Sequence, residues 1–487
     1  MKRNKNIKHR QNEIREAERK RKERLEEKNA KKLKPDLFHL NLYFTRNYPS
    51  HFTFKLIDYL FLTLVTFISF VTHLIKNGSP SSVVFDEVYF GNFTQYYHKG
   101  IYYFDIHPPL GKELLYLGSL ISGYQPNQTY SYIGAPLDKS QIARLRLWPC
   151  LTGSLIAPVI YLTLRILDVN PQWSLTVGLF LSTDNALIVE TRLVLIDAYL
   201  SFFASLTLLF CSIITRKPKH IKYISILAGI FAGSCVSIKF TGCGIAVTLV
   251  VVYLMTYPLI EAMLYSFISA ISGFSIFFLS FIIHFMMLPH PGPGCRYHTP
   301  DFCQKLSKHK HDNYIVSTIN LISIMLRSNF AISATHSYSS KWWQWPFMLG
   351  KGTYLWVEDM SQLWCVGSPV VWLSGVVGII AFLCFLCLRW DLSRKLLWLL
   401  FGYLISYLPF ACIKRVMYNY HYFIPLIVSL IMGAVALSHF FPNAFVTPAL
   451  LCLAALVAYM VWFPITYGTP ISNKLFSKIM FHKWIYE

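Results

Sequence analysis

The hydrophobic residues of this chain gather in long blocks, and polar residues fill the stretches between them. Eleven blocks approach or exceed the length that crosses a bilayer, which is about 20 apolar residues in a helix. They run over residues 56–76, 145–167, 173–189, 192–213, 222–237, 241–258, 262–288, 367–389, 395–412, 422–439 and 445–464. This pattern predicts an all-α polytopic membrane protein with about eleven transmembrane helices.

The placement of Lys and Arg predicts which side of the membrane each polar segment occupies. Residues 1–34 carry 15 Lys or Arg against 6 Asp or Glu, and such basic segments stay on the cytosolic side. Counting spans from a cytosolic start puts the basic loops 216–220 and 389–395 on that side as well. The two long polar segments, 77–144 and 289–366, then face the lumen. Both are rich in aromatic, acidic and histidine residues, so we expect the functional site there.

These boundaries divide the chain into four regions. They are a basic cytosolic tail at 1–50, an N-terminal membrane region at 51–289, a second lumenal loop at 290–366 and a C-terminal membrane region at 367–487. We expect the tail to serve as a topology signal near anionic lipid headgroups, without binding nucleic acid. The tail is too long and too charged to be a cleavable signal peptide.

Composition favours the same class of protein. Hydrophobic residues make up 54% of the 487 residues and charged residues only 14%, whereas a soluble domain carries about 25% charged residues. Cys384 and Cys387 have the spacing of a zinc pair, but they lie inside an apolar block without a second pair. No carboxylate cluster with metal-ligand spacing stands out, so we expect no bound metal or cofactor.

Two further features are compatible with a lumenal side for the polar segments. Cys295 and Cys303 flank a polar loop, and they can form a disulfide if that loop faces an oxidising lumen. The first polar segment contains two glycosylation sequons, Asn92-Phe93-Thr94 and Asn127-Gln128-Thr129. Such triplets also arise by chance, so they support the orientation only weakly.

The first lumenal segment also holds two motifs with candidate chemistry. Asp86 and Glu87 are adjacent carboxylates just beyond a membrane span. Neighbouring side chains point in different directions, so we expect one to reach a site while the other orients a partner. The second motif is the stretch 102–112, in which two prolines follow His107 and fix an extended turn. Taken alone, the two motifs are equally well explained as a solvated acidic pair and a stiff interfacial loop.

Taken together, these motifs resemble the protein O-mannosyltransferase family, which has an Asp-Glu pair followed by a His-Pro-Pro-Leu-Gly-Lys stretch. The resemblance continues in order over about residues 50–430. The further matching stretches are Arg146-Leu147-Trp148-Pro149, Asp184 to Asp197, Ser237 to Gly242, Ile283-His284-Phe285, Gly292-Pro293-Gly294, His336 to Pro346, Arg415, and Tyr420-His421-Tyr422. Each motif is weak alone, but eight in the right order are a specific signal.

The resemblance implies a GT-C glycosyltransferase fold in the endoplasmic reticulum membrane, with a lumenal active site in the N-terminal membrane region. It also implies transfer of mannose from dolichyl phosphate mannose to Ser or Thr of secretory proteins, and pairing with a second copy or a paralogue. The chain departs from the eukaryotic pattern in one respect. Only Cys295 to Thr335 stand where those members insert a β-trefoil MIR domain, which puts acceptor recruitment by such a domain in doubt.

Transfer from a lipid phosphate needs a base for the acceptor hydroxyl and cations for the leaving phosphate. We expect Asp86 to be the base and Glu87 to orient the site against Arg146, although either carboxylate fits the first role. The candidate residues for donor and sugar binding are Arg146, Lys239, Arg415, His107, His421 and Tyr422. We expect the three tryptophans Trp342, Trp343 and Trp345 to anchor a lumenal segment at the membrane interface rather than to stack on a sugar. Asp184 and Asp197 fit functional and helix-end roles equally well.

Two other interpretations of the sequence remain open. A lipid-linked sugar transferase of the same fold with a lipid or oligosaccharide acceptor would also carry acidic residues in its first loop. A transporter or multispan scaffold should show charges at midspan and internal repeats. The chain has few midspan charges, of which Lys239 is the clearest, and no visible repeat. The order of motifs therefore favours the protein mannosyltransferase.

Overall fold

The computed structural model of the chain describes residues 54–308, 313–332, 336–481 and 484. The basic tail predicted at 1–50 lies outside the described residues. Within them, helices make up nearly all of the regular structure, and the only sheet is one hairpin. The prediction of an all-α membrane protein is therefore confirmed, with this hairpin as its one addition.

Nine helical segments of the described chain are long and apolar enough to cross a membrane. They are Leu56–Leu74, Lys139–Ile166, Asp197–Thr215, Ile221–Ile238, Leu259–Met287, Pro369–Leu388, Trp390–Cys412, Asn419–Phe440 and Val446–Tyr467. The other two predicted blocks are also helical but shorter, as α7 (Pro171–Thr183) and α11 (Cys243–Thr256). Each of the eleven apolar blocks thus corresponds to a helix.

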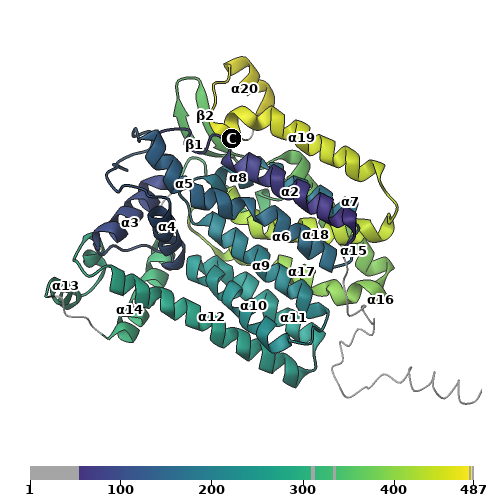
Figure 1. The fold of residues 1–487 in the computed structure, drawn as a ribbon, viewed down its shortest axis with the longest axis horizontal. Coiled ribbons are helices and arrows are strands. Elements are labelled where there is room, and N and C mark those ends of the chain that lie inside the picture. Colours follow the sequence, from purple (N-terminus) through teal and green to yellow (C-terminus); the bar gives the residue numbers. More distant parts are fainter. Residues whose placement is uncertain (1–53, 309–312, 333–335, 482–483, 485–487) are drawn as a thin grey trace, which may run out of the picture.

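The long helices run side by side, as Figure 1 shows. They are α2 (Leu56–Leu74), α5 (Lys139–Ser154), α6 (Ile156–Ile166), α9 (Asp197–Thr215), α10 (Ile221–Ile238), α12 (Leu259–Met287), α15 (Pro369–Leu388), α17 (Leu397–Tyr407), α18 (Phe423–Phe440) and α19 (Val446–Tyr467). Small residues allow close contact where two helices cross. A Cβ atom on Gly233 would lie 2.3 Å from Gly273 Cα, and one on Gly378 would lie 2.9 Å from Gly433 Cα. Such contacts bring backbones together in a membrane, where burial of apolar surface provides little drive.

A break at Asp184 separates α7 from the short helix α8 (Asn185–Arg192). The Asp184 carboxylate accepts hydrogen bonds from the backbone nitrogens of Leu187 (3.0 Å) and Ser368 (2.7 Å), and from Trp372 Nε1 at 3.1 Å. It therefore caps α8 and fixes the start of α15 at the same time. The helix-end role of Asp184 explains all of these contacts, and every residue of α8 is buried.

The two long polar segments lie at the same end of the helix bundle, on the left in Figure 1. The first contributes α3 (Glu87–Lys99) and α4 (Leu110–Ile121). The second contributes α13 (Pro300–Ser307), α14 (Tyr314–Ala331) and the antiparallel hairpin of β1 (Thr353–Glu358) and β2 (Ser361–Cys365). The short helix α16 (Trp390–Ser393), within the basic loop, lies at the opposite end. This arrangement agrees with the predicted placement of the polar segments on one side.

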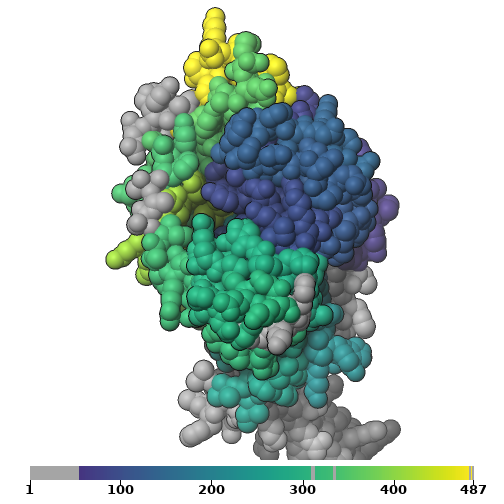
Figure 2. Space-filling view, turned by 90° about the vertical axis from the view of Figure 1, so that its left-hand side faces the viewer, coloured from purple at the N-terminus to yellow at the C-terminus, as the bar shows by residue number. Residues whose placement is uncertain are grey.

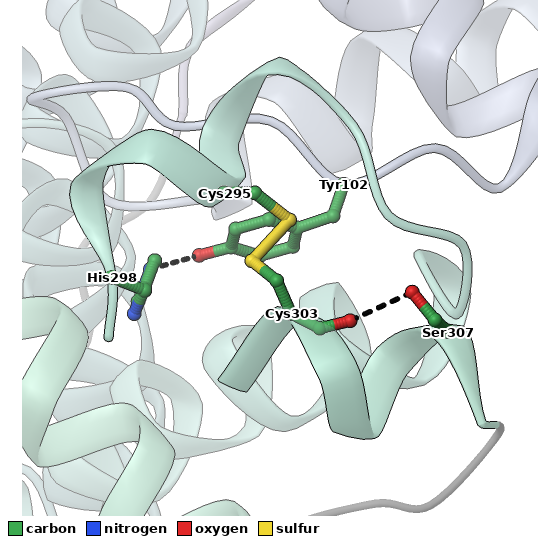
Figure 3. Close-up of a disulfide and its surroundings, with 5 residues drawn as sticks. All are labelled: Tyr102, Cys295, His298, Cys303 and Ser307. Carbon is green, nitrogen blue, oxygen red and sulfur yellow. Dashed lines mark hydrogen bonds between the residues drawn. A yellow bond between two sulfur atoms is a disulfide. The ribbon is translucent and has the colours of Figure 1, made fainter. Parts of the chain in front are cut away.

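A disulfide between Cys295 and Cys303 closes a small loop in the second polar segment (Figure 3), the pairing that the sequence allows if this loop faces an oxidising lumen. The Tyr102 hydroxyl, from the first polar segment, is hydrogen-bonded to His298 Nε2 inside this loop at 2.7 Å. Tyr102 and Phe302 also pack edge to face, with ring centroids 5.2 Å apart. The disulfide therefore shapes a segment that holds the two polar loops together.

Candidate active site at one end of the bundle

Donors from the protein occupy every hydrogen-bond acceptor position of the Glu87 carboxylate. Its Oε1 accepts from Arg146 Nε at 2.7 Å and its Oε2 from Arg146 Nη2 at 2.7 Å. The backbone nitrogens of Val84 and Val194 donate to the same carboxylate at 2.9 and 3.0 Å. Because Glu87 is completely buried and all of its acceptor positions are engaged, it orients the loop and does not take part as a base. The predicted pairing of Glu87 with Arg146 is confirmed.

The same contacts correct the prediction that Arg146 binds the donor. Beyond its two bonds to Glu87, the guanidinium donates to the carbonyl oxygens of Pro80 (2.7 Å) and Ser82 (3.1 Å). Arg146 lies on α5 with no exposed surface. A bidentate pair is the strongest arrangement that Arg forms. Four of the five N–H groups of this side chain bind protein oxygens, so it ties α5 to the loop before α3 and, being enclosed, does not present its charge to a phosphate.

Asp86, one residue earlier, lies in a different environment. It stands directly before α3, and its side chain does not cap that helix. It lines a cavity of about 620 Å³. The other lining residues are Val88, Tyr89, Phe90, Asn92, Phe93, Tyr96, Tyr103, Phe104, Asp105, Ile106, His107, Tyr130, Ser131, Pro293, Arg296 and Tyr297. Figure 2 looks onto this end of the molecule, where purple-to-blue residues of the first polar segment meet teal-to-green residues of the second.

The protein around Asp86 changes its acidity. Burial raises the pKa of the Asp86 carboxyl to about 7, the Lys239 ammonium opposes this rise, and the Asp197 and Asp105 carboxylates add to it. A carboxylate with a pKa near neutrality is a far better proton acceptor than an ordinary aspartate. Asp86 therefore combines an open approach with the basicity that a general base needs.

The stretch around His107 forms the neighbouring wall of the cavity. Lys112 Nζ donates to the Asp105 carboxylate and to the His107 carbonyl oxygen, both at 2.5 Å. Asn329 Nδ2 on α14 donates to the Ile106 carbonyl oxygen at 2.8 Å. These bonds fix the loop that leads into the two prolines. Burial, with the charges of Lys239 and Lys112, holds the pKa of the His107 imidazole well below its usual range, so the ring is neutral and able to accept or donate one hydrogen bond.

Lys239 meets the site from the end of α10. Its Nζ donates to both Asp197 oxygens, at 2.8 and 2.7 Å, and lies 5.5 Å from the centre of the Tyr420 ring. An ammonium has three donor hydrogens, so one remains after the two bonds to Asp197. This cation is neutralised locally by Asp197, yet it still influences both Asp86 and His107.

Arg415 supplies the charge that is not neutralised. The guanidinium forms no ion pair or hydrogen bond with any of the described residues, and it is half-buried between α17 and α18. Its charge is felt by His107 and His421, and Asp105 and Tyr420 influence it in turn. Arg415 is therefore available for an anion that enters this part of the protein.

His421 stands beside this cation, held by its neighbours. Its Nδ1 lies 3.0 Å from the Tyr418 carbonyl oxygen, and its ring is stacked on Tyr420 at 4.7 Å and on Trp345 at 6.1 Å. The bond at Nδ1 leaves Nε2 for other partners. The structure thus brings Asp86, His107, Lys239, Arg415 and His421 into one electrostatic neighbourhood.

Tyr422 does not lie with these five residues, and this corrects the prediction that it binds the donor or the sugar. It is fully buried, and its hydroxyl is hydrogen-bonded to Tyr403 at 3.1 Å. Its ring packs against Trp372 at 5.6 Å and Tyr407 at 5.3 Å. The short 3-10 turn Asn419–Tyr422 turns Tyr420 toward Lys239 and Tyr422 into the helix core.

The three tryptophans of the second polar segment have separate roles. Trp345 is buried and donates from Nε1 to Ser340 Oγ at 2.9 Å. Trp342 packs against Tyr407 at 5.3 Å. Trp343 is 47% exposed. Of the three, only Trp343 has the exposure that an anchor at the membrane interface requires.

Sequence reasoning missed several residues of this neighbourhood. Asp197 pairs with Lys239, Asp105 pairs with Lys112, and Tyr420 faces Lys239. Glu190 on α8 is buried, and its Oε2 has no hydrogen-bond partner among the described residues; the charges of Asp197 and Asp86 act on it. Asp197 was named from the sequence with its role left open, and the same signal, an ionisable residue next to an apolar block, was sufficient to find Glu190.

No group of three or more His, Cys, Asp or Glu side chains that suits a metal ion occurs in the described parts of the chain. Metal independence stays a prediction. What the arrangement offers chemically is a proton acceptor in an open cavity, a neutral imidazole in the same cavity, and the cations Lys239 and Arg415 whose charges act on these groups. This combination suits transfer of a group from an anionic leaving group to a hydroxyl.

Two protein-family models match the chain. The model described as dolichyl-phosphate-mannose-protein mannosyltransferase matches residues 63–290, and the model of the C-terminal four-span region of protein-O-mannosyltransferase matches residues 316–485. The mannosyltransferase 4 of Schizosaccharomyces pombe is 29% identical over 57% of this chain and 39% of its own length. The protein O-mannosyl-transferase 1 of Mus musculus is 33% identical over 37% of this chain and 25% of its own length. The chain thus spans well under half of these two curated relatives.

Solved structures show the same fold. The Saccharomyces cerevisiae protein O-mannosyltransferase Pmt1–Pmt2 complex bound to the sugar donor matches with a TM-score of 0.81 over 89% of this chain and 93% of that chain, at 16% identity. The oligosaccharyltransferase of Archaeoglobus fulgidus matches with a TM-score of 0.50 over 85% of this chain and 54% of that chain, at 14% identity. These matches confirm the predicted GT-C glycosyltransferase fold.

Proposed function

Because this chain belongs to the protein O-mannosyltransferase family, we propose that it transfers mannose from dolichyl phosphate mannose to Ser or Thr hydroxyls of secretory proteins. The observation that carries the proposal is the position of Asp86. Its carboxylate lines an open cavity, its pKa is raised to about 7, and the Lys239 ammonium is close enough to act on it. Its neighbour Glu87 is fully engaged elsewhere, so one carboxylate of the pair remains for chemistry.

The first step of the proposed mechanism activates the acceptor. A Ser or Thr hydroxyl enters the cavity and gives its proton to the Asp86 carboxylate. The rim of the cavity is largely aromatic, with Tyr89, Phe93 and Tyr297 among its lining residues. Such a surface contacts an extended peptide at low cost in side-chain entropy. The acceptor oxygen then attacks the anomeric carbon of mannose.

The second step releases the lipid phosphate. The bond between the anomeric carbon and the phosphate oxygen breaks as the acceptor oxygen attacks from the opposite face, so the configuration inverts. The phosphate is already acidic and needs no proton donor, but its charge needs cations. Arg415 is assigned this role because its guanidinium is not engaged by any described residue, and Lys239 is a second candidate because both cations act on His107. His107 and His421 are assigned to hydrogen bonds with the sugar or the phosphate.

We place the protein in the endoplasmic reticulum membrane, with its N-terminus cytosolic and the site lumenal. The orientation rests on the Lys and Arg distribution and on the shared end of the two polar segments. The similar yeast structure is a Pmt1–Pmt2 complex, and we propose that this chain also pairs with a second copy or a paralogue. Among its described residues the segment 289–366 contains two helices and a hairpin and no β-trefoil, so acceptor recruitment falls to the cavity rim or the partner.

The proposal is tested by incubating membranes that contain the chain with radiolabelled dolichyl phosphate mannose and a Ser/Thr-rich peptide. Label on the peptide with wild type and not with Asp86→Asn is the expected result. Label on a lipid or oligosaccharide, with none on the peptide, would replace the protein acceptor by the lipid-linked alternative. Absence of any label, including after co-expression with a paralogue, would overturn the proposed activity.

A further inference from the structure

The first polar segment contains two Asn-x-Thr sequons, and the structure gives their asparagines opposite surroundings. We propose that Asn127 carries an N-linked oligosaccharide in the mature protein and that Asn92 does not. The proposal rests on the lumenal orientation given above, because oligosaccharide is attached to sequons on that side. It goes beyond the transfer reaction, since here the chain is the acceptor of another enzyme.

The Nδ2 atom of Asn92, to which a sugar would be attached, already donates hydrogen bonds within the protein. Its Nδ2 donates to the Val88 carbonyl oxygen at 2.7 Å and to the Tyr130 carbonyl oxygen at 2.9 Å. An amide nitrogen has two hydrogens, and a glycosidic bond would remove one of them. The hydroxyl of Thr94 is also enclosed, since this residue is 1% exposed and its Oγ1 donates to the Phe90 carbonyl oxygen at 2.9 Å.

The position of Asn92 adds a second obstacle. It lies on α3 and lines the same cavity as Asp86. An oligosaccharide on this side chain would fill the space through which an acceptor reaches the base. A chain modified at Asn92 could not adopt the described structure without losing one of the two bonds that Nδ2 donates, to Val88 or to the Tyr130 loop. The sequon at Asn92 is therefore incompatible with a folded, working protein.

Asn127 has none of these restrictions. It is exposed in the loop between α4 and α5, and Thr129 is exposed as well. Its Oδ1 accepts from Gln128 Nε2 at 2.8 Å, and its Nδ2 donates no hydrogen bond within the described residues. The nitrogen that would carry the sugar thus belongs to an exposed residue that does not line the cavity.

Hydrogen bonds also fix the conformation of the loop that exposes Asn127. Gln128 Oε1 accepts from the backbone nitrogen of Asp138 at 2.9 Å, and the Gln128 carbonyl oxygen accepts from Gln95 Nε2. The flanking Tyr124 and Tyr130 are buried and hydrogen-bonded to each other through their hydroxyls at 3.2 Å. Because these contacts use Gln128, Tyr124 and Tyr130 and none uses Asn127 Nδ2, an oligosaccharide on Asn127 leaves them intact.

The modification is a group transfer with a defined balance. The co-reactant is an oligosaccharide linked to a lipid pyrophosphate, and a separate oligosaccharide transferase of the same membrane performs the step. The Asn127 Nδ2 forms a bond to the anomeric carbon, and the bond between that carbon and the pyrophosphate oxygen breaks. The pyrophosphate leaves on the lipid with the electron pair, and Nδ2 loses one proton to the transferase.

The test uses the full chain with an epitope tag, expressed in eukaryotic cells and run on denaturing gels before and after endoglycosidase treatment. Wild type should shift by one glycan on digestion. Asn127→Gln and Thr129→Ala should migrate at the digested position without treatment, and Asn92→Gln should behave like wild type. A shift that survives in Asn127→Gln, or is lost in Asn92→Gln, overturns the assignment. Because the readout is electrophoretic, it does not depend on correct folding of any variant.

A matched control separates this proposal from the orientation on which it rests. Asp138→Asn in the Asn127→Gln background creates an Asn-Lys-Ser triplet at exposed positions of the same loop. Asparagine can retain the cap that Asp138 gives to α5 through Gln141. If the new triplet is glycosylated while wild type is not, the loop is lumenal and only the Asn127 assignment fails. If neither is glycosylated, the lumenal orientation falls with it.

Discussion

Asp86 and Glu87 are consecutive residues whose carboxylates face opposite ways, Glu87 into a buried pair with Arg146 and Asp86 into an open cavity. The turn that begins α3 produces this division. It separates two requirements that a single carboxylate could not meet, because a base must be free to accept a proton while an anchor must be fully bonded. Replacing one carboxylate should therefore affect the reaction, and replacing the other should affect the fold.

Asp86→Asn should reduce mannose transfer by about 10²–10⁴-fold, the usual contribution of a general base. The amide keeps the shape of the side chain but has no basic oxygen of comparable strength. Transfer is measured in membranes with equal amounts of inserted protein. Activity within a few-fold of wild type would remove Asp86 from the mechanism.

Glu87→Gln makes the same chemical change one residue later, with a different expected result. It leaves the Arg146 guanidinium buried without its counter-ion, and breaking a buried pair in this way costs about 3–5 kcal/mol. Thermal unfolding of the detergent-purified protein should show a large loss of stability for Glu87→Gln and little change for Asp86→Asn. Equal stability of the two variants would contradict the assigned roles.

The rate should depend on pH through the pKa of Asp86. A base must be deprotonated, so kcat/KM for the acceptor should be low in acid and rise as the pH passes about 7. The effect on stability has the opposite sign. Because the folded pKa lies above the usual value of 3.8, ionisation of this group favours unfolding as the pH rises from that value toward 7. A rate that rises already near pH 4 would show that Asp86 is not buried as described.

Asp197→Asn should move that pH profile toward acid. The Asp197 carboxylate raises the pKa of Asp86, and the Lys239 ammonium lowers it. Removing the Asp197 charge leaves Lys239 unneutralised, so Asp86 should titrate at a lower pH. Asp168→Asn is a suitable control because its partner Arg216 belongs to another part of the chain. A loss of activity without any displacement of the profile would indicate a purely structural role for Asp197.

Arg415→Gln should reduce kcat by about 10²–10³-fold, the typical effect of removing one stabilising group from developing negative charge. Stability should change little, because Arg415 forms no hydrogen bond or ion pair within the described residues that the substitution could break. Arg389→Gln, at an exposed position at the end of α15, provides the matched control and should retain full activity. If Arg415→Gln shows wild-type kinetics, Arg415 does not stabilise the leaving phosphate and Lys239 takes that role.

Much of this architecture could be predicted from the sequence because apolar length is a strong signal. Every predicted span became a helix, and the two polar segments that were predicted to share one side lie at one end of the bundle. The division of 173–189 at Asp184 could not be seen in that way, since one acidic residue in an apolar run looks the same whether it caps a helix or enters a site. Only the bonds from Ser368 and Trp372, far along the chain, decide between the two.

The site was predictable at the level of motifs but not of side-chain direction. Tyr420 and Tyr422 are equal candidates in the sequence, and the 3-10 turn alone determines which of them meets Lys239. Arg146 was assigned to the donor because arginine suits phosphate. The pairing with Glu87 across 59 positions was predicted as well. The additional bonds to the carbonyl oxygens of Pro80 and Ser82, which enclose the guanidinium, have no signature in local sequence.

Arg415 has a consequence for turnover. The proposed donor is a phosphate diester with a single negative charge, which one guanidinium balances. The spent carrier is a monoester with a charge of about −1.5 to −2 near neutral pH, and one guanidinium no longer balances it. Asp105 lies close enough to influence Arg415, and Asp86 becomes negative again once it gives up the acceptor's proton. The reaction therefore leaves the site with surplus negative charge, which favours departure of the spent lipid and readies the enzyme for the next donor.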